Sequence, residues 1–284
     1  MNPSAGGGRA GKAMPSVEAA LAAAGTPHHA EHTGSLDHAR ELAAAAAARG
    51  EIAVAFGGDG LVGAVADALR HTDGVLGVLP GGRGNDFARV LGIPLEPVAA
   101  CAVLITGVER ALDLGEAGGR AFVGIASCGF DSDCNRIANE TRIVRGNLVY
   151  VYSALRGLAG WHPARFRIEL DGDEVVSVRG YNVIAANSRA YGGGMYIAPD
   201  ASLEDGMLDV LAIAEMPKLR FLRLLPTVFK GRHVVRPEVM LRRAREVRVS
   251  ADRPFTMYAD GDPIAELPVT VRALPGAVRV MVPA

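Results

Sequence analysis

Two glycine-rich segments that also carry acidic residues follow short apolar runs in the first third of the chain. The segment GGDG (residues 57–60) comes directly after the run at residues 52–56, and PGGRGNDFAR (residues 80–89) follows the run at residues 75–79. Backbone amides left bare by glycine at the start of a helix suit phosphate oxygens. Asp59 would repel a phosphate unless a cation lay between them, so GGDG favours a Mg²⁺-bound nucleotide, with an ordinary strand-to-helix turn as the alternative.

Three further segments carry residues of chemical interest. NPSAGGGR at residues 2–9 contains three glycines beside Arg9 and Lys12, which suits an anion and equally suits a flexible terminus. In the second glycine-rich segment, Arg83 and Arg89 are available to phosphate groups, while Asn85 or Asp86 could instead cap the following helix. Asp260-Gly261-Asp262, near the end of the chain, is most often a turn.

The elements that carry these segments alternate between strand and helix. The apolar runs at residues 52–56 and 75–79 predict parallel strands covered on both faces. Helices are predicted at residues 15–24, 35–49, 62–70 and 85–91. This pattern indicates an α/β domain over residues 1–112, with a parallel sheet and helices on both faces. Because ligands bind at the carboxyl ends of such strands, the two glycine-rich loops should share one ligand.

From about residue 113 onward, strands dominate. We predict a β-rich sandwich domain over residues 113–284, with its last strand returning to the first domain, and a tight cleft between the domains. Helices at residues 147–158 and 218–230 interrupt it. The predicted strands cover residues 121–126, 164–170, 175–186, 208–214, 247–250, 255–258, 269–273 and 278–282.

Composition excludes several classes of protein. With 49% hydrophobic and 21% charged residues in 284, the chain is globular, and a net charge of −1 argues against a nucleic-acid partner. Three cysteines without a C-x-x-C pair imply neither disulfides nor a zinc site. The chain shows no signal peptide and no membrane-spanning run, so we expect a cytoplasmic protein whose membrane contact would be peripheral, at the inner face.

Two surface features leave alternatives open. The stretch at residues 218–236 mixes basic and apolar residues, which suits either an anionic membrane surface or an ordinary amphipathic helix packed on the β-rich domain. An exposed strand edge could pair two chains as a homodimer.

The ordered set NPSAGGGR, GGDG, GRGNDFAR and DGD resembles the diacylglycerol kinase catalytic family, which includes bacterial lipid kinases and sphingosine kinases and is related to NAD kinases. Asn187 and residues 192–195, 199–210 and 231–233 extend the likeness over nearly the whole chain. The resemblance implies an NAD kinase-like α/β domain, a β-rich domain and a site between them. It also implies ATP- and Mg²⁺-dependent phosphorylation of a lipid hydroxyl, such as that of diacylglycerol.

The resemblance also assigns site residues. Asp262, Asp260 and Asp59 would be catalytic, one of the first two as the general base, and Arg9, Lys12 and Arg89 would contact phosphate. The nucleotide would be held by Asn2, Pro3, Ser4, Ala5, Gly6, Thr33, Gly57, Gly58, Asp59, Gly60, Leu61, Arg83 and Asn85. Magnesium would be organised by Asp59, Asp86 and Asp131, and a second, structural ion by Ser202, Asp205 and Met207.

The sequence departs from the family pattern in four places. Leu61 and Arg83 stand where threonine is common, and Asp262 stands where glutamate is common. The family also has a strand before Asn2, so either the true start lies upstream of Met1 or the sheet lacks an edge. Two other functions therefore stay open: a kinase of a soluble acceptor such as NAD, and a nucleotide-binding protein without kinase activity.

Overall fold

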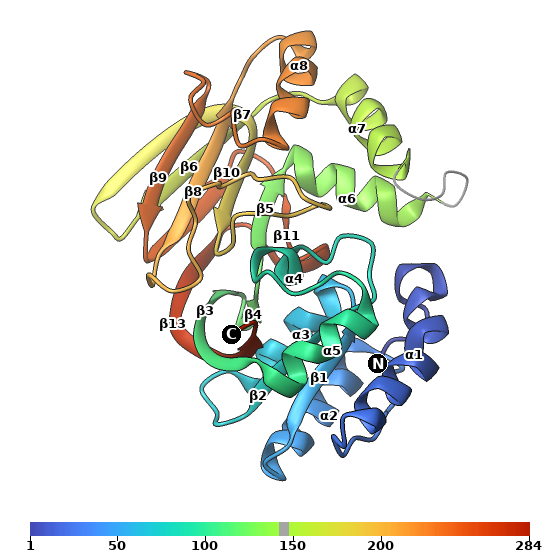
Figure 1. Ribbon diagram of the computed structural model, residues 1–284. Coiled ribbons are helices and arrows are strands. Elements are labelled where there is room, and N and C mark those ends of the chain that lie inside the picture. The colour runs from blue at the N-terminus through green and yellow to red at the C-terminus, as the bar shows by residue number, and fades with distance from the viewer. Residues whose placement is uncertain (142–147) are drawn as a thin grey trace.

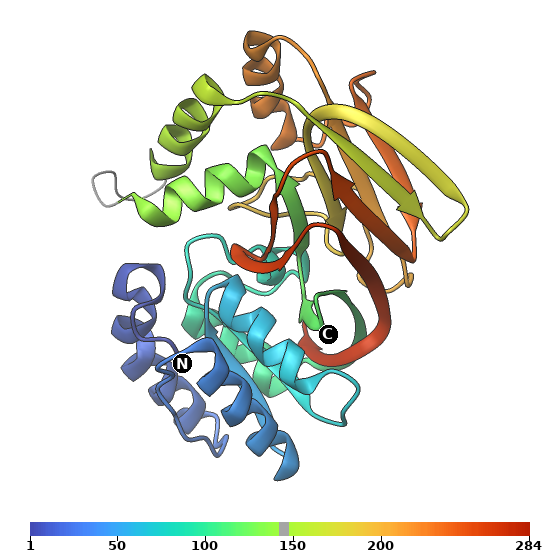
Figure 2. The same cartoon turned by 180° about the vertical axis from the view of Figure 1, so that it is seen from behind.

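The computed structural model describes residues 1–141 and 148–284. The chain forms two lobes, an α/β lobe that holds both termini and a β-rich lobe flanked by helices (Figure 1). The view from behind shows the same division, with the long last strand running from one lobe into the other (Figure 2).

The first lobe has the predicted α/β pattern. Strands β1 (Ile52–Gly57) and β2 (Val75–Pro80) pair in parallel with Ile52 opposite Val75. Helix α2 begins as the sequence indicates, because the Ser35 side chain accepts a hydrogen bond from the His38 amide at 3.0 Å. The helices of this lobe are α1 (Ala5–Ala23), α2 (Leu36–Ala48), α3 (Asp59–Leu69), α4 (Asp86–Val90) and α5 (Pro97–Thr106).

The second lobe is built from antiparallel strands and three helices. Helices α6 (Phe130–Glu140), α7 (Leu148–Gly160) and α8 (Lys218–Val228) lie beside the sheet (Figure 1). Residue 147, where the first of the two helices predicted in this region starts, lies outside the described residues. The remaining strands are β3 (Val108–Ala117), β4 (Arg120–Phe122), β5 (Ile125–Gly129), β6 (Ala164–Leu170), β7 (Glu174–Ala186), β8 (Leu208–Ala214), β9 (Val239–Ala244), β10 (Glu246–Ala251), β11 (Thr256–Ala259), β12 (Asp262–Glu266) and β13 (Val269–Val282). Of these, β3 and β4 lie in the α/β lobe (Figure 1).

Strand β13 connects the sheets of the two lobes. It pairs antiparallel with β10 and β3, and its last residues pair in parallel with β2, Arg279 opposite Val75. Two separate strands with a Pro275-Gly276 turn were expected here. Instead one strand runs through, with an irregular register between Leu274 and Val278, because the Gly276 amide is held by the carboxylate of buried Asp113 at 2.7 Å.

Other differences from the predicted elements are local. The single strand expected at residues 121–126 is divided into β4 and β5, since the backbone turns at Val123 and Gly124 to bind Asp260. Helices α5 and α6 and strands β3, β9 and β12 were not predicted. Within the described ranges, no helix combines the length and apolar character needed to cross a bilayer.

Candidate functional site at the junction of the two lobes

The loops after β1 and β2 touch each other, as their positions in a parallel sheet require. The Gly81 amide donates to the Gly57 carbonyl at 2.7 Å, and Gly82 crosses Gly58 so closely that a Cβ on residue 82 would lie 2.4 Å from the Gly58 Cα. The two backbones therefore need glycine at the crossing. The Asn85 side chain accepts from the Gly82 amide at 2.8 Å and fixes the second loop.

The N-terminal segment joins these loops. The Asn2 amide donates to the Phe56 carbonyl at 3.1 Å, and the Thr33 amide donates to the Met1 carbonyl at 2.9 Å. Gly6, Gly7 and Gly8 have φ values of 60°, 74° and 90°, a left-handed turn at the start of α1. The segment is thus an ordered turn beside the other two loops, and Pro3, Ser4 and Ala5 lie within it.

Four basic side chains border the three loops. Arg9 donates to the Gly82 carbonyl, and Arg89 lies near the Gly84 carbonyl at 3.4 Å. Arg9, Lys12, Arg83 and Arg89 are all exposed, which leaves them accessible to a phosphate. Leu61, by contrast, is 6% exposed and its side chain packs against Gly57, so only its backbone borders the loop.

Asp59 and Asp86 converge on Gly84. A Cβ on residue 84 would lie 2.9 Å from Asp86 Oδ2 and 3.2 Å from Asp59 Oδ2, so both carboxylates face the same glycine. Asp59 Oδ1 accepts from the Phe87 amide at 3.1 Å. Burial raises the pKa of Asp59, and the negative charge of Asp86 raises it further, because a second anion disfavours ionisation.

Both oxygens of Asp86 are hydrogen-bonded to the other lobe. Asp86 Oδ2 accepts from the Gly193 amide and Oδ1 from the Gly194 amide, each at 2.7 Å. The side chain is almost fully buried, and this bidentate contact joins α4 to the loop at residues 191–195. Asp86 therefore holds the two lobes together beside Asp59.

Asp260 and Asp262 lie on either side of the turn between β11 and β12. Asp260 is held by three backbone amides, from Val123 and Gly124 at 2.9 Å and from Ile125 at 3.2 Å. Burial raises the pKa of Asp260 to about 7 against these hydrogen bonds, and the charge of Asp59 acts in the same direction as burial.

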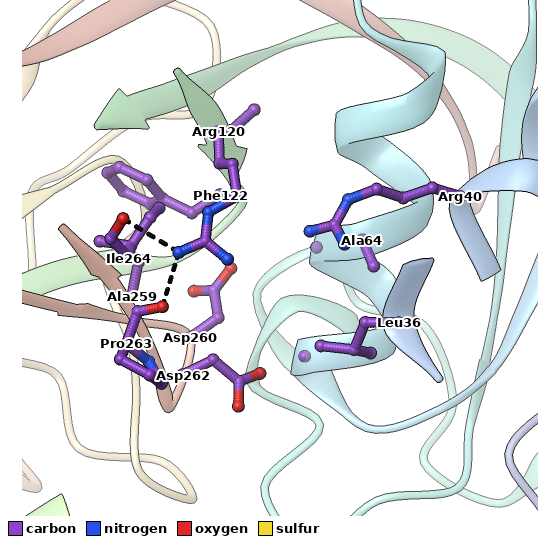
Figure 3. A pocket seen from close by; sticks show the side chains of 13 residues that line it. Leu36, Arg40, Ala64, Arg120, Phe122, Ala259, Asp260, Asp262, Pro263 and Ile264 are labelled. Atoms are coloured by element: carbon purple, nitrogen blue, oxygen red, sulfur yellow. Dashed lines mark hydrogen bonds between the residues drawn. The ribbon is translucent and has the colours of Figure 1, made fainter. Parts of the chain in front are cut away.

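Asp262 points into the pocket between this turn and the helices α2 and α3, where Arg40 and Arg120 also lie (Figure 3). Arg120 donates to the carbonyls of Pro263 and Ile264, which fixes it on the hairpin. Asp262 is exposed as a whole residue, but partial burial of its carboxylate raises its pKa. The guanidinium groups of Arg120 and Arg40 act against that rise. The two cations offset part of the effect of burial and so act toward the ionised form that a general base requires.

Asp131 belongs to a separate part of the site. Tyr191 donates to Asp131 Oδ2 at 2.9 Å, and the side chains of Ser127 and Asn182 also hydrogen-bond the carboxylate. Burial raises the pKa of Asp131, and burial together with the Asp131 charge keeps the pKa of Tyr191 well above its ordinary value. Tyr191 precedes the glycines that bind Asp86, so one loop reaches both carboxylates.

These carboxylates can hold a metal ion only with help from other ligands. In the part of the chain that the structure describes, no three His, Cys, Asp or Glu side chains form a cluster that could bind one. Asp86 and Asp131 accept hydrogen bonds from the loop at residues 191–195, whereas Asp59 Oδ2 faces Gly84 in the second glycine-rich loop. Magnesium commonly uses one or two carboxylates with substrate phosphates and water, and Asp59 beside the glycine-rich loops fits that mode.

The loop expected to bind a second ion is held by hydrogen bonds and an ion pair within the protein. Asp205 Oδ1 accepts from the Met207 amide at 3.0 Å, and its other oxygen forms an ion pair with Arg243. The Ser202 hydroxyl accepts from the Glu204 amide at 3.2 Å. Arg243 therefore supplies the positive charge that an ion would bring to Asp205.

The structure adds site residues to which sequence reasoning gave no role. Arg40 and Arg120 lie beside Asp262, and Tyr191 with Gly193 and Gly194 binds Asp131 and Asp86. The run Tyr191-Gly192-Gly193-Gly194 was a usable signal, because three glycines outside a predicted turn suggest backbone contact with a partner. Arg40 and Arg120 carry no such signal among 27 arginines.

An α/β lobe with glycine-rich loops, joined to a β-rich lobe that contributes carboxylates, is the two-domain architecture of the NAD kinase-like fold. Residues 1–117 match the family model for the diacylglycerol kinase catalytic domain, and residues 124–282 match that for the YegS C-terminal NAD kinase beta sandwich-like domain. The chain belongs to the diacylglycerol kinase catalytic family, a family of lipid kinases.

Individual relatives agree with that assignment. A diacylglycerol kinase of Mycobacterium tuberculosis is 38% identical over 289 residues, covering 99% of this chain and 93% of the relative. A diacylglycerol kinase of Bacillus subtilis is 31% identical, covering 75% and 71%. The fold is shared with the crystal structure of a putative diacylglycerol kinase from Bacillus anthracis, at a TM-score of 0.80 and 22% identity, covering 99% and 94% of the two chains.

Proposed function

We propose that this protein transfers the γ-phosphoryl group of ATP, in a Mg²⁺-dependent reaction, to the hydroxyl of a lipid such as diacylglycerol. The observation that carries the proposal is the position of Asp262, whose carboxylate lies against the first turn of α3, the helix that follows the loop GGDG. A base from one lobe thereby lies beside the phosphate-binding loops of the other.

Some of the site residues would position the nucleotide and the metal ion, and another would transfer the proton. Amides of the loops at residues 2–6, 57–61 and 82–85 would hold the phosphates, and Arg9, Lys12, Arg83 or Arg89 would contact their oxygens. Asp59 would hold Mg²⁺ together with phosphate oxygens and water. When bound, the ion neutralises charge on the phosphates.

Asp262 is the proposed general base. It would accept the proton of the acceptor hydroxyl as that oxygen forms a bond to phosphorus and the bond to ADP breaks. Asp260, held by three amides, would position the turn that carries Asp262 and would not itself take the proton. This division selects between the two carboxylates that the sequence leaves equivalent.

Incubation with radiolabelled ATP, Mg²⁺ and a total lipid extract, followed by chromatography, tests the proposal. Label should enter a lipid, and Asp262→Asn should lower kcat at least ~100-fold, within the range for loss of a general base, with little change in ATP binding. Asp252→Asn, at an exposed position, is the matched control. Label in NAD alone would favour a soluble acceptor, and ATP binding without any transfer would leave a nucleotide-binding protein.

A further inference from the structure

The segment from α8 to Arg236 presents basic and apolar side chains to solvent. Residues 218–236 contain six basic residues and no acidic one. Leu219 is 70% exposed, Phe229 53% and Val235 81%, which are three of the four largest exposed fractions among the large apolar side chains that the structure describes as exposed. We call this surface the basic face; its exposed members are Lys218, Leu219, Arg220, Arg223, Phe229, Lys230, Arg232, Val235 and Arg236.

The positive charge of the basic face is largely uncompensated. Among the described residues, only Arg220 of this segment forms an ion pair, with Glu238. Leu219 and Arg223 lie four residues apart in α8 and so share one side of the helix, while Phe221, Leu224 and Val228 are buried on the other. The inner side of α8 therefore satisfies packing, and the outer side has no partner within the described chain.

Helix α7 lies next to the start of α8. The Lys218 ammonium donates to the Ala159 carbonyl at 2.9 Å, which ties the start of α8 to the end of α7. Both helices lie at the end of the β-rich lobe farthest from α2 (Figures 1 and 2). Tyr152 and Leu155 are exposed on α7, and Arg156 lies over the Tyr152 ring at 5.9 Å.

The basic face is connected to the site by hydrogen bonds. The Tyr196 amide donates to the Val228 carbonyl at 3.1 Å, and His233 Nε2 contacts the Ile197 carbonyl at 2.8 Å. Residues 196 and 197 continue the loop whose Gly193 and Gly194 bind Asp86. On the buried side of α8, the ring of Phe221 packs edge-on against that of Phe130, with 5.2 Å between the ring centroids. Phe130 directly precedes Asp131.

We propose that the basic face, with the exposed side of α7, docks on an anionic lipid bilayer, its cations at the headgroups and Leu219, Phe229 and Val235 inserted among the acyl chains. Basic residues near anionic lipid and apolar side chains inserted at the interface are the two contributions that bind a peripheral protein. The proposal rests on the proposed function, since a lipid acceptor would be presented at that bilayer.

Co-sedimentation with vesicles of phosphatidylcholine and phosphatidylglycerol tests the charge. Each basic residue near an anionic surface contributes about a fivefold increase in binding, so the double variant Arg223→Glu, Lys230→Glu should bind at least ~30-fold more weakly. The matched control, Arg165→Glu with Arg248→Glu, makes the same change in net charge at exposed positions on β6 and β10 and should bind like wild type. Equal loss in both double variants would overturn the proposal.

The apolar contacts need a separate variant. Phe229→Ser with Val235→Ser keeps every charge, and should abolish the binding that remains at about 1 M salt, where the Debye length is only ~3 Å. If this variant binds vesicles as well as wild type at every salt concentration, the apolar side chains do not enter a bilayer. That result would overturn the proposed bilayer docking and favour a soluble polyanion as the partner of the basic face.

Phosphorylation of a dispersed short-chain diacylglycerol separates this proposal from the proposed function. Both surface variants should keep wild-type rates on that acceptor without vesicles, and their circular dichroism should match that of wild type. A wild-type protein that phosphorylates the acceptor but fails to bind anionic vesicles would refute the docking surface alone. A wild-type protein that binds vesicles but transfers no phosphate would support the docking surface and refute the proposed kinase activity.

Discussion

Gly60 and Asp262 approach each other so closely that a side chain at position 60 would displace the carboxylate. A Cβ built on Gly60 would lie 2.9 Å from Asp262 Oδ2 and 3.9 Å from the Asp260 carbonyl oxygen. One turn further along α3, a Cβ on Gly63 would lie 3.0 Å from Asp260 Oδ2. Two glycines one turn apart thus form the surface of α3 against which the carboxylates of the other lobe rest.

We expect Gly60→Ala to lower kcat at least tenfold, because the added methyl group must push Asp262 away from the phosphate-binding loop. Nucleotide affinity should change little, since the backbone conformation at residue 60 is helical and accepts alanine. Steady-state kinetics with titration of ATP binding measures both effects. Gly34→Ala, where a Cβ would meet nothing within 4 Å, is the control, and equal activity of the two variants would argue against this contact.

The Asp260 carboxyl should make stability depend on pH. Its pKa is about 7 in the folded protein against 3.8 ordinarily, so the folded state retains a proton that the unfolded chain has lost. Stability contributed by this group is present at low pH and is lost as the pH rises from about 4 to 7, by at most about 1.4 kcal/mol per pH unit.

Asp260→Asn removes this titration. The free energy of unfolding of wild type, measured with urea at pH 5 and pH 8, should fall more steeply with pH than that of the variant. The variant should be less stable at pH 5, because its amide group cannot accept hydrogen bonds at both oxygen positions. Parallel pH profiles for the two proteins would contradict the buried, protonated carboxyl.

Asp86→Asn should loosen the contact between the lobes. One side-chain NH₂ group would face the Gly193 or Gly194 amide, replacing an acceptor with a donor, at a cost of about 1–3 kcal/mol in the free energy of unfolding. Activity should fall together with stability, because Asp86 and the neighbouring Asp59 face the same glycine, Gly84, and a shift of residue 86 would disturb the position of Asp59. Asp133→Asn, a substitution of a more accessible aspartate on α6, serves as the control in urea unfolding. If Asp86→Asn retains full stability, the amides do not depend on that carboxylate.

The sequence predicts this fold well wherever local signals suffice. The runs at residues 52–56 and 75–79 become parallel β1 and β2, and Ser35 caps α2 as expected. Strands at residues 164–170 and 208–214 have the predicted bounds. Helix α6 was missed although Phe130, Cys134 and Ile137 recur at helical spacing, because polar residues make up most of the segment. Strand β13 was expected as two strands, because the hydrogen bond from the Gly276 amide to distant Asp113 leaves no local signal.

The candidate site could also be predicted only where local signals suffice. The loops after β1 and β2 meet as parallel strands dictate, so Asp59 and Asp86 could be placed together from their spacing. The roles of Asp260 and Asp262 could not be separated, because the difference arises from the amides of Val123 and Gly124, more than a hundred residues away. The pairing of Asp205 with Arg243 likewise depends on the packing of β8 against β9.

Arg243→Gln should destabilise the protein more at pH 8 than at pH 5. Arg243 lies 3.9 Å from buried Asp209, whose pKa burial raises to about 6 while the guanidinium acts in the opposite direction. Without the cation that pKa rises further, so the folded state is penalised once Asp209 must ionise, whereas at pH 5 the carboxyl is already protonated. Because Arg243 is half exposed, we expect a difference of only about 1 kcal/mol between the two pH values, measured by urea unfolding. Arg242→Gln, at the neighbouring exposed position paired with Glu174, should show no such pH dependence, and an equal effect in both variants would contradict the role of Arg243.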